Sequence, residues 1–82
     1  MLNIQYGSNF LKTISKIKDN SIREQIKKQI IKITENPEIG KPMRYDRKGT
    51  REVYVQPFRL SYVYLHEEEK IIFLEIYHKK KQ

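Results

Sequence analysis

The chain has 82 residues and no cysteine, and 17 lysines and arginines outnumber 10 aspartates and glutamates, for a net charge of +7. This length allows one domain with one core, and the lack of cysteine excludes disulfides and thiolate metal sites. No apolar run approaches the roughly 18 residues of a membrane span, so we expect a cytoplasmic protein with no membrane partner. The charge favours an acidic or polyanionic partner, with a solvated lysine-rich surface as the alternative.

The first half of the chain predicts a strand followed by two helices. Residues 2–6 alternate apolar and polar side chains, as in a short strand that ends at Gly7. Ser8 is the expected N-cap of a helix that runs to about Lys18. Ser21 and Glu24 form a capping-box pattern at the start of a second helix, which the Asn36-Pro37 pair ends. Two amphipathic helices joined by a short polar turn predict an antiparallel hairpin.

The second half has strand periodicity. Residues 43–46 predict a short edge strand, residues 53–65 two strands that reverse at Pro57, and residues 71–77 an apolar final strand. The predicted order is β-α-α-β-β-β, a single α+β domain over residues 1–82 with the two-helix hairpin on one face of a mainly antiparallel sheet. The predicted core comprises Ile22, Ile26, Ile30, Ile33, Val53, Val55, Leu60, Ile72, Leu74 and Ile76.

Basic side chains are concentrated in the third quarter of the chain and at its end, with aromatic residues between them. Cations hold phosphates and aromatic rings stack on bases, so these segments predict contacts with RNA. Arg59 stands out because no acidic side chain is expected to face it. It either binds an RNA phosphate or is an ordinary exposed residue at the end of a hairpin. No pair of histidines has the spacing of metal ligands, and we expect no metal and no cofactor. The candidate RNA-binding residues are Lys41, Arg44, Lys48, Arg51, Phe58, Lys79 and Lys80.

The helix pair, the Asn-Pro break, the segment "RKGTREVYVQPFRLSYVY" and a last strand ending in "HKKK" resemble the RelE/ParE superfamily of toxins from toxin–antitoxin systems. The "FRL" turn carries the strongest part of this resemblance. In its RelE branch the resemblance implies a RelE-like fold and cleavage of messenger RNA in the ribosomal A site. It also implies that a cognate antitoxin, acidic or of mixed charge, folds onto the toxin and neutralises it. Such enzymes need no metal, because the 2′-hydroxyl of the RNA attacks the adjacent phosphate.

The resemblance also suggests roles for individual residues. Arg59 matches the catalytic arginine, whose planar fork suits two phosphate oxygens. His78 matches a histidine acid or base, and Lys81 lies in the basic tail that supplies a second cation. Glu52 is either a substitute base or a cross-strand salt-bridge partner, and Tyr77 is expected to stack on a base or donate a proton.

The sequence departs from the RelE pattern at several positions. The paired lysines of well-studied members fall at Glu52 and Tyr54, and the glutamate of a related branch falls near Met43. Two alternatives therefore stay open beside the nuclease. One is a ParE-like inhibitor of DNA gyrase, and the other is a toxin that has lost catalysis and keeps only antitoxin or RNA binding.

Overall fold

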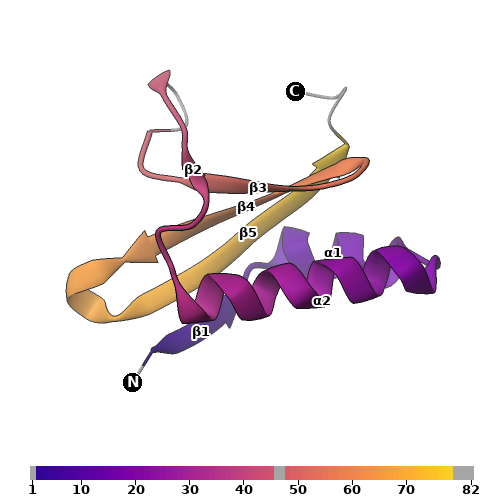
Figure 1. Ribbon diagram of the computed structural model, residues 1–82, viewed down its shortest axis with the longest axis horizontal. Coiled ribbons are helices and arrows are strands. Elements are labelled where there is room, and N and C mark those ends of the chain that lie inside the picture. The colour runs from indigo at the N-terminus through magenta and orange to yellow at the C-terminus, as the bar shows by residue number, and fades with distance from the viewer. Residues whose placement is uncertain (1, 46–47, 79–82) are drawn as a thin grey trace.

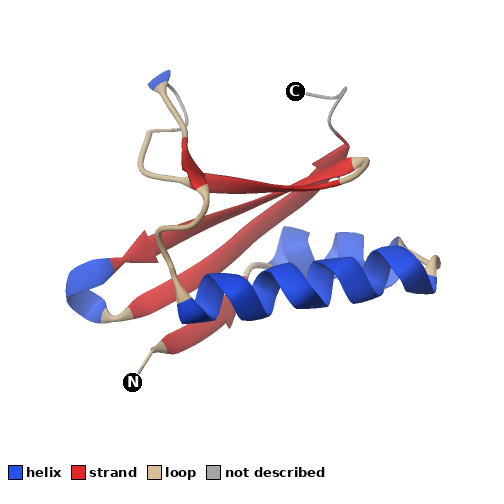
Figure 2. Cartoon of the chain, viewed as in Figure 1, coloured by secondary structure: helices blue, strands red, loops and turns tan. Residues whose placement is uncertain are grey.

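Two helices lie over one face of a five-stranded sheet in this computed structural model, which describes residues 2–45 and 48–78 (Figures 1 and 2). The strand order is β1-β5-β4-β3-β2. Neither described helix is long and apolar enough to cross a membrane. The elements in chain order are β1 (Asn3–Tyr6), α1 (Ser8–Lys16), α2 (Asn20–Glu35), β2 (Lys41–Pro42), β3 (Arg51–Val55), β4 (Phe58–Leu65), a 3₁₀ turn (His66–Glu68) and β5 (Lys70–His78).

The α+β fold confirms the prediction, although the chain has one strand more than the β-α-α-β-β-β order and the sheet is mixed. Strands β2 to β5 pair antiparallel, whereas β1 pairs parallel with β5 at the other edge. A parallel pair needs a long connection, and the whole chain between β1 and β5 supplies it. The short edge strand lies at Lys41–Pro42, just before the predicted residues 43–46.

The helix starts differ from the predicted ones. Gly7 is the N-cap of α1 and Ser8 is already its first residue, so Ser8 is not the cap. At α2 the carboxylate of Asp19 accepts hydrogen bonds from the backbone N–H groups of Ser21 (2.8 Å) and Ile22 (3.3 Å). The predicted capping box at Ser21 is therefore wrong, because an aspartate two residues earlier already satisfies the free N–H groups of the first turn. The end of α2 before Asn36-Pro37 is confirmed.

The core forms between the helices and the inner face of the sheet. Of the predicted members, Ile26, Ile33, Val55, Leu60 and Ile76 are buried, and Ile22, Ile30 and Val53 pack against them. Ile71 and Phe73 are fully buried, in place of the predicted Ile72 and Leu74. The buried set also includes Phe10, Ile17 and Tyr62.

A β-bulge explains why the prediction chose the wrong side of β5. Ser61 of β4 pairs with Glu75, but the next residue, Tyr62, pairs with Phe73, so Leu74 is the extra residue. An extra residue reverses the alternation of side chains along a strand. In β5 the odd-numbered residues Ile71 and Phe73 therefore face the core before the bulge, and the even-numbered Ile76 faces it after the bulge.

Tyr62 anchors the connection between α2 and β2. Its hydroxyl donates a hydrogen bond to the carbonyl of Pro37 (2.7 Å) and accepts one from the N–H of Gly40 (2.9 Å). A Cβ on Gly40 would lie only 2.6 Å from that hydroxyl, so the close approach requires glycine. Burial raises the pKa of Tyr62 above its ordinary value, and the Gly40 hydrogen bond and the nearby Arg51 partly oppose that rise.

Truncation of Ile26 tests the core. Ile26 is 1% exposed, so Ile26→Ala should lower the free energy of unfolding by about 2–5 kcal/mol, through lost burial and the cavity left behind. Ile31 on the same helix is 51% exposed, and Ile31→Ala should change it by only about 0.5 kcal/mol. Urea denaturation of the two variants makes the comparison, and equal losses would contradict the assigned helix face.

Alkaline titration tests the Tyr62 anchor. An unfolded tyrosine has a pKa of about 10, and burial raises the folded value, so with rising pH Tyr62 loses its proton first in the unfolded chain. Tyr62 therefore contributes its full stability below pH of about 10, and this contribution falls as pH rises further. Urea denaturation between pH 8 and 11 should show that the wild type has a higher free energy of unfolding than Tyr62→Phe. This difference should be constant at first and then shrink as the pH rises. Tyr45→Phe, at an 88% exposed position, should show no such change, and a constant Tyr62 advantage would refute the anchor.

Candidate functional site

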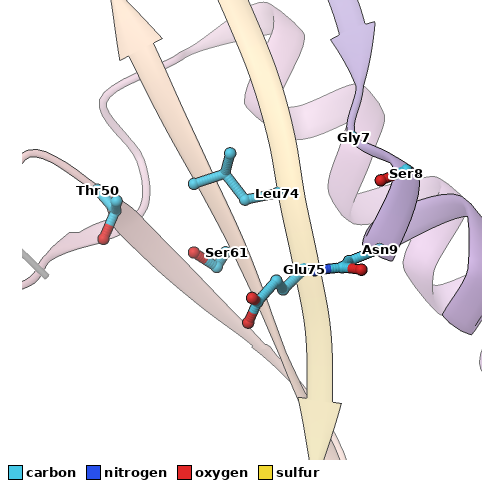
Figure 3. A pocket seen from close by; sticks show the side chains of 7 residues that line it. All are labelled: Gly7, Ser8, Asn9, Thr50, Ser61, Leu74 and Glu75. Atoms are coloured by element: carbon cyan, nitrogen blue, oxygen red, sulfur yellow. The ribbon is translucent and has the colours of Figure 1, made fainter.

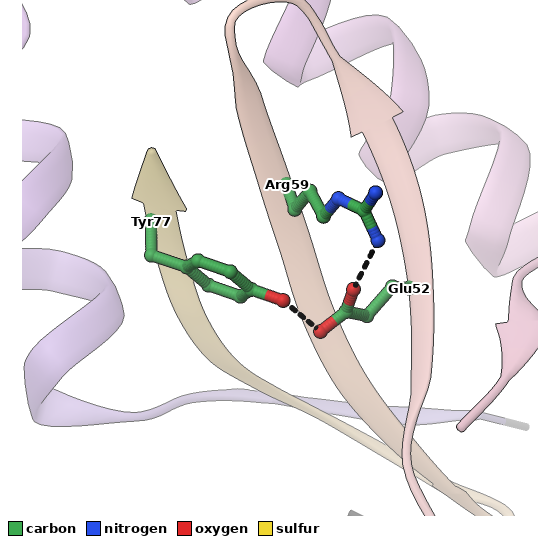
Figure 4. Close-up of polar contacts among 3 residues, drawn as sticks. All are labelled: Glu52, Arg59 and Tyr77. Carbon is green, nitrogen blue, oxygen red and sulfur yellow. Dashed lines mark hydrogen bonds and ion pairs between the residues drawn. The ribbon is translucent and has the colours of Figure 1, made fainter. Parts of the chain in front are cut away.

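The outer face of the sheet, away from the helices, gathers three of the predicted catalytic residues. Arg59 of β4 lies directly opposite Tyr54 of β3 on one side and Tyr77 of β5 on the other. Directly opposed residues in antiparallel strands point to the same face. Glu52 of β3 lies diagonally from Arg59, and Figure 4 shows Arg59 and Tyr77 converging on its carboxylate from neighbouring strands.

The carboxylate of Glu52 is buried, and both of its oxygens are engaged. Nη1 of Arg59 donates to Oε1 at 3.4 Å and forms an ion pair there, and the hydroxyl of Tyr77 donates to Oε2 (Figure 4). The Glu52 side chain is only 3% exposed, compared with 31% for Arg59. A buried charge needs such partners, because an unpaired carboxylate away from water is costly.

The expectation that Arg59 faces no acidic side chain was therefore wrong. The cause is the hairpin register, since the turn at Gln56-Pro57 pairs Val55 with Phe58 and so brings residue 52 diagonal to residue 59. The sequence could have indicated this contact, because equal numbers of residues counted outward from the two-residue turn give the cross-strand pairs. Glu52 acts as a cross-strand partner of Arg59, one of its two predicted roles, and this does not exclude the other role as a base.

Arg59 keeps unused hydrogen-bonding capacity. Its Nε is buried and has no hydrogen-bond partner among the described residues. Buried donors are nearly always satisfied in folded proteins, so an orphaned one at a concave surface needs an explanation. A guanidinium carries five N–H donors in a planar fork, and the pair with Glu52 engages only one side of it. An anion that draws the guanidinium outward would satisfy the remaining donors.

A cavity of about 320 Å³ opens beside this cluster. Lys41 of β2 pairs directly with Glu52 in the sheet register, so its ammonium group belongs to the same face. Lys41 and Arg59 thus flank one carboxylate, and Tyr54, half exposed, adds an aromatic surface. The lining residues are Lys41, Met43, Glu52, Val53, Tyr54 and Arg59.

His78 is not brought into this cluster. It pairs with Phe58, one residue away from the Arg59–Tyr77 pair, and therefore belongs to the opposite, inner face. The two rings meet edge to face with centroids 5.9 Å apart, and Phe58 packs against the core. The acid–base role of His78 and the RNA contact of Phe58 stay predictions, because both side chains lie on the face of the sheet opposite to that of Arg59.

The other basic residues fall into three places. Arg51 donates two hydrogen bonds to the carbonyls of Glu38 (3.0 Å) and Gly40 (2.8 Å), which helps to hold the α2–β2 connection. Arg44 and Lys48 are exposed on the connection between β2 and β3. Lys79, Lys80 and Lys81 lie outside the described residues. Of the predicted RNA-binding residues that the structure describes, only Lys41 lines the cavity beside Arg59.

The comparisons with known proteins agree with this architecture. A profile of the "ParE toxin of type II toxin-antitoxin system, parDE" family matches residues 4–82. No curated protein matches the chain at a significant level.

Several solved toxins share the fold at low sequence identity. The chain superposes on the Escherichia coli RelBE toxin–antitoxin complex with a TM-score of 0.79 and 19% identity, covering 95% of this chain and 96% of that one. The Mycobacterium tuberculosis RelBE2 toxin–antitoxin complex has a TM-score of 0.80 and 18% identity, with 95% of this chain and 98% of that chain covered. A YoeB/ParE toxin from Agrobacterium tumefaciens has a TM-score of 0.83 and 13% identity, with 94% of this chain and 98% of that chain covered. The chain therefore belongs to the ParE toxin family of type II toxin–antitoxin systems, within the RelE/ParE superfamily.

Proposed function

We propose that this toxin cleaves messenger RNA on the ribosome and thereby inhibits translation. The Glu52–Arg59–Tyr77 cluster carries the proposal, because it joins a carboxylate, a guanidinium and a phenol on an outward-facing part of the sheet. Cleavage by the RNA's own 2′-hydroxyl needs a base, an acid and a cation for the pentacoordinate phosphorus. The cluster contains one group of each kind.

The groups have complementary roles in this scheme. Glu52 takes the proton of the attacking 2′-hydroxyl, whose oxygen forms a bond to phosphorus as the bond to the 5′-oxygen breaks. Tyr77 gives its hydroxyl proton to the departing 5′-oxygen, and Arg59 and Lys41 stabilise the charge on the non-bridging oxygens. The products are a 2′,3′-cyclic phosphate and a 5′-hydroxyl. The Tyr77–Glu52 hydrogen bond then offers a direct path for the proton to return from Glu52 to Tyr77.

A cognate antitoxin is the second partner that we propose. The similar RelBE structures from E. coli and M. tuberculosis are toxin–antitoxin complexes. In this chain a groove of about 250 Å³ between the helices is lined by apolar and charged side chains, two basic and one acidic: Ile14, Arg23, Glu24, Ile26, Lys27 and Ile30. Such a groove suits a segment that folds on binding, with apolar anchors and acidic side chains.

Inhibition of DNA gyrase is the second candidate function, and the family profile, which is that of ParE, favours it. In addition, Glu52 partly neutralises Arg59 and so weakens its pull on a phosphate. Expression of the toxin without antitoxin, with messenger-RNA ends and DNA supercoiling measured in the same cells, separates the two functions. Intact messenger RNA with lost supercoiling would favour the gyrase target, and no effect on either would indicate a toxin without catalysis.

Substitution of Arg59 tests the catalytic cation. Arg59→Ala should slow single-turnover cleavage of ribosome-bound messenger RNA by about 10²–10³, the loss expected for one donor to a developing anion. Arg59→Lys should recover only part of the rate, because an ammonium keeps the charge but not the planar fork. Lys28→Ala removes an exposed cation from α2 and should leave the rate within about twofold, as surface charges away from a site usually do.

Stability needs control in this experiment, because Arg59→Ala leaves the buried Glu52 without its ion-pair partner. Thermal melts set a temperature at which every variant is folded, and the rates are compared there. If folded Arg59→Ala cleaves as fast as the wild type, Arg59 has no part in the chemistry.

Glu52→Gln separates the base from a merely electrostatic role. The amide cannot accept the 2′-hydroxyl proton, so the cleavage rate should fall by about 10²–10⁴, the usual contribution of a general base. The same change frees Arg59 from its negative partner, so ribosome-bound RNA should bind at least as tightly as before. Single-turnover rates measured over a range of toxin concentrations give both quantities. Weaker binding with an unchanged maximal rate would instead assign Glu52 to holding the site together.

A further inference from the structure

A second and larger cavity, of about 440 Å³, opens on the same outer face of the sheet (Figure 3). It adjoins the cluster described above, because Ser61 of β4 pairs with Glu52 on one side and with Glu75 on the other. The bulge in β5 and the amino end of α1 meet here. The lining residues are Gly7, Ser8, Asn9, Thr50, Ser61, Leu74 and Glu75.

The amino end of α1 supplies hydrogen-bond donors to one wall. The N-cap Gly7 offers no side-chain cap, and the first turn contains no acidic residue. The first backbone N–H groups of a helix lack partners within it and carry partial positive charge. Gly7 brings them close to β5, since a Cβ there would lie 3.1 Å from the carbonyl oxygen of Phe73.

Ser61 and Glu75 supply the other polar groups. Ser61 is only 6% exposed, and its hydroxyl has no hydrogen-bond partner among the described residues. The hydroxyl borders the cavity and is free to donate a hydrogen bond to a ligand there. Glu75 is exposed, and within the described part of the chain its carboxylate forms no ion pair. Figure 3 shows both side chains at this cavity, which Asn9 also lines.

These groups fit a nucleobase better than a phosphate. A carboxylate repels phosphate oxygens, but it accepts hydrogen bonds from the N–H groups at the edge of a base. Guanine presents two adjacent N–H donors beside a carbonyl oxygen, which matches a carboxylate next to helix N–H donors. Leu74 provides an apolar surface for the face of the ring. Uracil would place carbonyl oxygens against the carboxylate.

We propose that this cavity is a subsite for a guanine base of the RNA, with Glu75 accepting from the base edge and the first turn of α1 and Ser61 donating to it. The proposal rests on the proposed function in taking RNA as the substrate. It assigns the specificity of the site to residues outside the Glu52–Arg59–Tyr77 cluster. Glu75 lies two strands from Glu52, so the base would belong to a nucleotide close to the reacting phosphate.

Nucleotide titration followed by amide NMR of the isolated protein tests the subsite without cleavage. Guanosine 3′-monophosphate should shift the amide signals of residues 7–9, Ser61 and Glu75. It should also bind about tenfold or more tightly than uridine 3′-monophosphate, the discrimination expected from a bidentate contact with a base. Glu75→Gln should remove most of this preference. Glu67→Gln, which removes an exposed carboxylate on the 3₁₀ turn, should keep it.

The outcomes separate this subsite from the nuclease proposal. Equal affinity for the two nucleotides, signal shifts confined to other residues, or a preference that survives Glu75→Gln would each overturn the subsite, whatever the cleavage assay shows. Guanine-selective binding that depends on Glu75, in a protein that cleaves no RNA, would support the subsite and refute the nuclease.

Discussion

The extra residue in β5 is the constraint on which the rest of the structure depends. Without the bulge at Leu74, Tyr77 would point to the same face as Phe73, into the core. With it, Ile71 and Phe73 pack under the helices while Tyr77 reaches Glu52 on the outer face. The bulge also lies where Gly7 approaches β5, so it shapes the cavity at the start of α1. One irregular position therefore serves both the core and the candidate site.

Charge is distributed unevenly over the molecule. The chain carries a net charge of +7, yet its best-formed polar cluster surrounds a buried carboxylate. An ion pair at this depth contributes little net stability, because desolvation offsets most of the attraction. Its structural effect is to hold Arg59 across the sheet with one donor still unsatisfied.

Much of the fold could be predicted from local patterns, and much of the site could not. Helical spacing of Ile26 and Ile33 and the stop at Asn36-Pro37 predicted α2, and alternation predicted β3 and β4. The sequence singled out Arg59, Glu52 and Tyr77 through a family resemblance. It did not indicate that they touch, because their contact depends on the pairing of three strands from separate parts of the chain.

The sequence by itself determined most of the element types and the superfamily, since these follow from local periodicity and short motifs. Only the tertiary structure decided which face each strand residue occupies. It placed His78 on the inner face with Phe58, moved Leu74 out of the predicted core, and joined Ser61 and Glu75 in one cavity. The physical reason is that one inserted residue reverses side-chain direction along a strand. That insertion is fixed by packing between distant segments, and no local pattern records it.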